Sequence, residues 1–221
     1  MQQIFDRTVA ARIAVRNTSE HIRLRMAVRF SLLYFVFFML GLLLDRILPI
    51  AALPSWKSLF EEALASPLMG DVPARDEIRA VLYAARREML LLILLLLSGM
   101  TMFSERACGV LLSLHGVLFG MLCRGMTSVY TPTMPPSEGA RLLICALSQF
   151  AYAAVFLTAA GEAVIFSYRY RDVGRGPRKV REAISVRYFL QALVLFGTLA
   201  AIAAIRALLL FALQNMSIPR V

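Results

Sequence analysis

Histidine, cysteine and charge are all scarce in this chain of 221 residues. It has 2 histidines (His21 and His115) and 3 cysteines (Cys108, Cys123 and Cys145). No cysteine pair has CxxC spacing, so neither a disulfide framework nor a zinc site is expected. The chain also lacks HExxH spacing, a glycine-rich phosphate loop, and a serine with histidine and aspartate companions. We therefore expect a protein that is not an enzyme, with no catalytic residue, metal or cofactor.

The hydrophobic share is far above that of a soluble domain. Hydrophobic residues make up 59% of the chain and charged residues 17%, against roughly 45–50% and about 25% in soluble domains. The lipid bilayer is the expected surroundings. We assign the net charge of +10 to the flanks of membrane spans, because a nucleic-acid partner would require a basic face on a soluble fold. The first apolar run begins too late for a secretory signal peptide and is expected to stay as an anchor.

Five apolar runs predict membrane-spanning helices. They cover residues 27–44, 89–103, 107–123, 142–168 and 188–213. The second run is the shortest, and at 1.5 Å per residue it reaches only about 22 Å. Ser104-Glu105-Arg106 separates it from the third run, and these charges are best placed at a membrane surface, so the two runs predict a tight hairpin. The expected fold class is an all-α, polytopic membrane helical bundle of about five transmembrane helices.

Basic residues predict the orientation. The tail (1–26) and its junction with the first span, the hairpin and the loop 169–187 together hold fourteen of the 24 Lys and Arg residues. The segment 45–88 holds six basic residues and seven acids. Because Lys and Arg gather in cytoplasmic loops, the N-terminus is expected inside and the C-terminus outside. The expected location is the bacterial cell membrane, including a septal membrane, as a multi-pass protein.

Two segments outside the apolar runs have helical periodicity. The tail, 1–26, reads as a basic amphipathic helix on the inner leaflet. In the first outer loop, 45–88, a short helix is expected at 56–65, and a second amphipathic helix leads into the second span. The outer helices either rest on the bilayer or dock an extracytoplasmic partner. The second helix is indicated by Ile78, Val81, Leu82, Ala85 and Met89.

Polar residues inside the runs are candidates for function, because ionisable groups at membrane depth are costly. Arg206 is expected to reach outward or to bond to Gln149, and Glu162 to reach the inner interface near Arg106 or Arg169. A direct Glu162–Arg206 ion pair is not expected, because their depths differ by roughly 10 Å. The histidine would make one interhelical hydrogen bond. Alternatively, all four line the path of a permease: His115, Gln149, Glu162 and Arg206.

Small residues predict close helix packing. Gly116 and Gly120 form a GxxxG pattern in the third span, preceded by Gly109. In the fourth span, Gly161 lies between Ala159 and Ala163. In lipid, such residues let helix backbones approach closely. These faces also allow an oligomer.

The order of these features resembles the stage II sporulation protein M family. The resemblance is best over residues 89–171, in Leu97-Ser98-Gly99, the glycine-spaced run 109–125, Leu147-Ser148-Gln149, and the run from Gly161 to Arg169. Ser148 stands where the family has proline, and Glu162 is a charge not expected there. The resemblance implies a non-enzymatic, five-span membrane scaffold that anchors cell-wall hydrolases of the stage II D and P types during forespore engulfment. The loop 45–88 would meet these partners. The alternative is a permease subunit of a transporter or export system.

Overall fold

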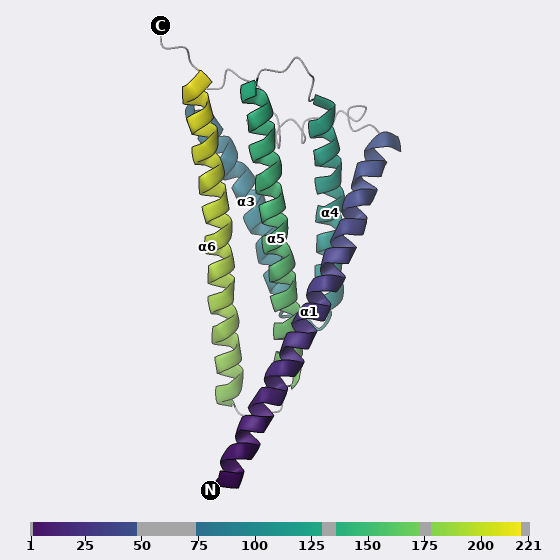
Figure 1. Ribbon diagram of the computed structural model, residues 1–221, viewed down its shortest axis with the longest axis vertical. Coiled ribbons are helices and arrows are strands. Elements are labelled where there is room, and N and C mark those ends of the chain that lie inside the picture. The colour runs from purple at the N-terminus through teal and green to yellow at the C-terminus, as the bar shows by residue number, and fades with distance from the viewer. Residues whose placement is uncertain (1, 48–73, 130–135, 173–177, 218–221) are drawn as a thin grey trace.

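The computed structural model describes residues 2–47, 74–129, 136–172 and 178–217. These residues form an all-α bundle (Figure 1). The helices are α1 (Gln2–Ile47), α3 (Ala74–Ser98), α4 (Ser104–Val129), α5 (Pro136–Asp172) and α6 (Arg178–Ser217). The predicted fold class of a helical membrane bundle is confirmed.

Four of the described helices are long and apolar enough to cross a bilayer. The apolar segments are Ile22–Leu44, Ser104–Arg124, Gly139–Arg171 and Ile184–Leu213. The chain is therefore a multi-pass membrane protein. The predicted second span, 89–103, is not among the four, because α3 has only ten uncharged residues after Glu88 before it ends at Ser98. Helix α3 nevertheless runs beside the other helices through much of the bundle (Figure 1).

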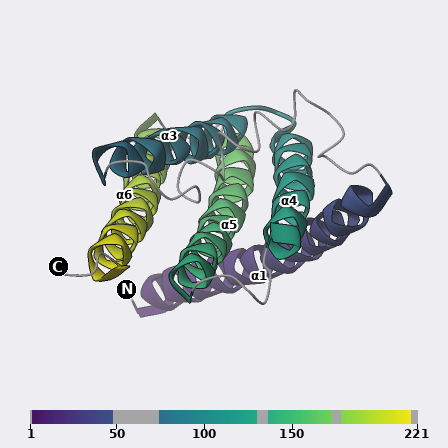
Figure 2. The same cartoon turned by 90° about the horizontal axis from the view of Figure 1, so that it is seen from above.

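Helix α5 lies at the centre of the packing. Helices α4, α5 and α6 form a row in which α5 contacts both neighbours. Helix α1 crosses one face of this row against α4 and α5, and α3 packs on α4, α5 and α6 from the other side (Figure 2). The start of α1 and the α3–α4 turn lie toward one end of the bundle, and the end of α6 lies at the other (Figure 1).

Several predicted boundaries differ from the structure. The tail 1–26 is not a separate helix, because α1 runs unbroken for 46 residues, or about 69 Å, more than twice the roughly 30 Å of a hydrocarbon core. The hairpin turns at 99–103, and Ser104 already begins α4. The loop 169–187 is largely helical, since α5 ends at Asp172 and α6 starts at Arg178. The expected helix at 56–65 lies outside the described residues.

The turn at 99–103 follows from close packing. A Cβ added at Gly99 would lie 2.9 Å from the carbonyl oxygen of Ala163 and 2.6 Å from the hydroxyl of Tyr188. This hydroxyl donates to the carbonyl of Leu96 at 2.6 Å. Ser167 of α5 donates to the carbonyl of Thr101 at 3.1 Å. The charged Glu105 and Arg106 made 104–106 the expected turn, but contacts with α5 and α6 decide its position.

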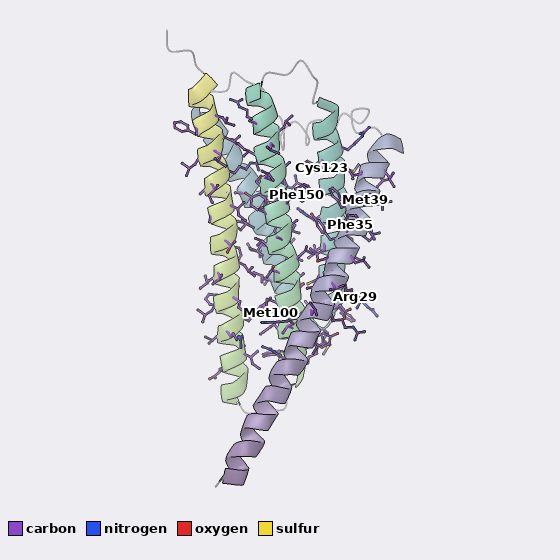
Figure 3. The ribbon with its side chains drawn as sticks, viewed as in Figure 1. Arg29, Phe35, Met39, Met100, Cys123 and Phe150 are labelled. Carbon is purple, nitrogen blue, oxygen red and sulfur yellow. The ribbon has the colours of Figure 1, made fainter. Side chains whose placement is uncertain are left out.

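Each helix buries one stripe and leaves large apolar side chains outside. On α1, the buried Met26, Phe30 and Tyr34 recur every fourth residue, as expected for one helix face. Phe35 and Met39 of α1 are exposed (Figure 3). On the surface of a soluble protein such an apolar area would be unusual, whereas in a membrane protein it faces lipid.

Among the glycines of the described residues, those of α1 and α4 make the closest contacts between helices. A Cβ added at Gly120 would collide with the backbone carbonyl of Phe38, and one added at Gly41 would collide with that of Val117. A Cβ at Gly116 would lie 3.0 Å from the carbonyl oxygen of Tyr34. The GxxxG pair of α4 therefore faces α1, with Gly41 as its counterpart.

We predict that Gly120→Ala destabilises the protein by about 1–3 kcal/mol, because the added methyl group meets backbone and forces the two helices apart. The measurement is unfolding in detergent, followed by circular dichroism. Gly197→Ala is the matched control, because a Cβ at that position of α6 has no atom within 4 Å. Equal unfolding midpoints for the two variants would show that the crossing adds nothing to stability.

Candidate functional site

Five of the polar side chains inside the bundle include one from each described helix. Four of them are at most 8% exposed, and the side chain of His115 is 11% exposed. A buried polar group in lipid must find its partners within the protein. The five side chains are Tyr34 of α1, Glu88 of α3, His115 of α4, Tyr152 of α5 and Arg206 of α6.

His115 joins α1, α3 and α4. Its Nδ1 lies 3.0 Å from the hydroxyl of Tyr34, and its Nε2 lies 3.6 Å from Oε2 of Glu88. With an ionised Glu88, the proton of a neutral imidazole belongs on Nε2, and the tyrosine hydroxyl then donates to Nδ1. The 3.6 Å separation is an electrostatic contact and is too long for a hydrogen bond. The ring of Phe156 meets the imidazole edge-on, with centroids 4.9 Å apart.

Arg206 is 4% exposed and does not reach outward. Its Nη2 donates to Sγ of Cys145 at 3.5 Å. Cys145 lies on α5 one helical turn before Gln149, the partner expected from the sequence. Tyr152, one turn further, interacts electrostatically with both Arg206 and Glu88. Tyr152 thus connects Arg206 to the His115 cluster, which consists of Tyr34, Glu88 and His115. We call these five side chains the polar layer.

Glu162 pairs with a residue of the N-terminal helix. Nη2 of Arg23 lies 2.9 Å from Oε1 and 3.3 Å from Oε2 of Glu162. The expected partners were Arg106 and Arg169, and of these Arg169 does interact electrostatically with the carboxylate. The tail therefore supplies a charge partner for α5 in addition to its expected role in orientation.

A second link between helices lies near the same end. Arg29 of α1 forms an ion pair with Glu105, and Tyr168 of α5 donates to Oε2 of Glu105 at 3.0 Å. Arg29 lies toward the lower end of the bundle, as does Met100 in the turn (Figure 3). Helices α1, α4 and α5 are thus held together by charge at this end.

The remaining predicted packing residues differ in their surroundings. A Cβ at Gly109 would make an ordinary contact, 3.7 Å from Leu33, whereas one at Gly161 would meet no atom within 4 Å. Ala159 and Ala163 are fully buried on either side of Gly161. Close packing on α5 therefore involves the alanine face, and within the described residues Gly161 lies beside open space.

The sequence reasoning missed Glu88, Tyr34, Tyr152 and Arg23. The sequence places Glu88 at the end of the outer loop, yet in the structure it lies three residues after the buried Ala85, on the same face of α3. Arg23 similarly precedes the buried Met26 and Phe30 on one face of α1. A charge within an apolar stripe at helical spacing was the available signal. The two tyrosines gave none, because tyrosine is common in apolar spans.

The chemistry available to this layer is hydrogen bonding and charge pairing. Within the described residues, no group of three or more His, Cys, Asp or Glu side chains is placed to hold a metal ion. The cysteines are free, with Cys108 and Cys145 buried. Cys108 lies 2.9 Å from the hydroxyl of Ser98 and so links α3 to α4. The polar side chains connect helices to one another.

Comparison with protein-family models found no match, and comparisons with curated proteins and with solved structures also found none. The class of the protein therefore follows from its own fold: a helical, multi-pass membrane protein with a polar layer inside the bundle.

We predict that Glu88→Leu destabilises the protein by roughly 1–3 kcal/mol, because it removes the carboxylate that faces His115 Nε2 and leaves this polar group against an apolar side chain inside the bundle. Glu88→Gln should cost less, because the amide oxygen keeps a polar group facing the imidazole. Arg86→Leu is the control, since it also removes a charge from α3 but at an exposed position. Unfolding in detergent measures all three variants. A smaller effect of Glu88→Leu than of Arg86→Leu would rule out a role for the buried carboxylate.

Proposed function

We propose that the chain is a non-enzymatic scaffold of a bacterial cell membrane, whose bundle holds other proteins in place. The observation that carries this proposal is the pairing of charged side chains between helices. Glu162 binds Arg23, Glu88 faces His115, and Arg29 pairs with Glu105. Each pair joins two different helices, so the charged side chains hold the helices in position relative to one another.

The packing of the interior supports the same proposal. Fully buried apolar side chains, including Leu92, Leu112, Phe156 and Leu199, fill the space between the helices. Close packing of this kind favours one fixed arrangement over an opening and closing path. A scaffold requires a fixed shape to present partners to one another.

The finer proposal is a role of the stage II sporulation protein M type. In that role the chain anchors cell-wall hydrolases of the stage II D and P types during forespore engulfment. Support comes from the resemblance over residues 89–171 and from the positions of the end of α1 and the start of α3, which border the middle of the segment 45–88 and lie at the end of the bundle opposite the start of α1 (Figure 1). This end would face the cell wall if the N-terminus is cytoplasmic.

The direct test uses a tagged protein in the native host. We predict that hydrolases of these two types co-purify with it from detergent extracts of sporulating cells, and that its deletion blocks engulfment in membrane-dye microscopy. A tagged membrane protein of similar size and abundance is the control for co-purification. Normal engulfment in the deletion strain would refute the sporulation role.

A permease subunit is the second candidate. The His115 cluster favours this candidate, because a histidine between a hydroxyl and a carboxylate is chemically suited to pass a proton. Glu162 and Arg206 are the charged residues that a path along α5 and α6 would include.

Glu162→Gln and Arg206→Met separate the two candidates. For a scaffold, we predict that partner co-purification falls only as far as the folded fraction falls. Gly120→Ala is the matched control, because it lowers stability without changing a polar residue. For a permease, solute uptake into liposomes would be lost while the variant protein stays folded. Uptake by the unaltered protein that these two variants abolish would overturn the scaffold proposal.

A further inference from the structure

A cavity of about 230 Å³ lies between α5 and α6. It is close to the end of α5 and the start of α6, away from the His115 cluster. The lining combines polar and apolar side chains. These are Glu162, Ile165, Phe166, Arg169, Ile184, Arg187, Tyr188 and Gln191.

Among the described residues that line this cavity, basic side chains outnumber acidic ones. Of the eight described residues that line it, Glu162 is the one acid, and it is already bound to Arg23 at 2.9 Å. Arg169 lies close enough to Arg187 and Arg23 for their like charges to interact. The lining thus contains two arginines and one carboxylate, which Arg23 already binds. A bound anion between Arg169 and Arg187 would relieve this repulsion.

The cavity also lies at a polar–apolar boundary. The apolar segment of α5 ends at Arg171, and that of α6 begins at Ile184. Phe166 and Tyr188 stack on its wall, with ring centroids 4.0 Å apart. Ile165 adds a buried aliphatic surface. A ligand here would place its charged part against arginine and an apolar part against the helices.

We propose that this cavity binds the phosphate of an anionic phospholipid headgroup, with Arg169 and Arg187 as its cationic ligands. Arginine binds phosphate oxygens through paired N–H donors. Basic pockets between transmembrane helices are suited to anionic headgroups. The aromatic and aliphatic wall favours a lipid over free phosphate, because acyl chains continue from the headgroup into the bilayer. The site does not depend on the scaffold role.

The test is lipid binding to the purified full-length protein in detergent, read by native mass spectrometry. Phosphatidylglycerol and phosphatidylcholine are titrated separately, with inorganic phosphate as a competitor. We expect one phosphatidylglycerol to bind in preference to phosphatidylcholine. Arg187→Gln should weaken this binding roughly fivefold, as expected for one arginine near a membrane surface. Arg169→Gln should do the same.

Arg106→Gln is the matched control, because it removes an exposed arginine near the same end of the bundle but outside the cavity. Circular dichroism checks that each variant keeps its helix content, and the exposed Arg187 is the safer position for folding. Equal binding of the two lipids, or equal losses in Arg187→Gln and Arg106→Gln, would overturn the proposal. Complete displacement by millimolar phosphate would assign the site to the free anion instead.

Discussion

The close crossing of α1 and α4 positions most of the charged contacts in the bundle. Without side chains at Gly41, Gly116 and Gly120, the two backbones come into direct contact. This contact places Tyr34 beside His115 and sets the path of α1 toward α5, where Arg23 meets Glu162. Because lipid offers no hydrophobic driving force between helices, van der Waals contact of this kind is the main source of their association.

The polar layer has a different effect from that of the glycine crossing. A smooth glycine face lets helices slide or rotate past each other, because many positions give similar packing. A buried histidine or arginine has few acceptable positions, because any shift leaves a polar group facing lipid. With Tyr34, Glu88, His115, Tyr152 and Arg206 on five different helices, the layer fixes the relative heights of all of them.

The sequence predicted the elements better than their partners. Apolar runs and the GxxxG pattern located the helices and the close-packing face of α4, because both depend on local composition. The partner of Glu162 lay 139 residues away, and no local pattern identifies Arg23. The turn at 99–103 was missed for a related reason, because its position depends on Ala163 and Tyr188, which are distant in sequence.

The short apolar part of α3 follows from its contacts with other helices, which replace contacts with lipid on one face. A helix that faces lipid all round requires about 20 apolar residues, whereas α3 packs against α4, α5 and α6. Its buried Glu88 faces His115, and the exposed Arg86 and Arg87 lie further toward its start. The bundle therefore accepts a helix that hydropathy alone would reject, because protein contacts replace lipid on its inner face. The same replacement lets the interior carry charge and still hold the fixed shape that the proposed scaffold role requires.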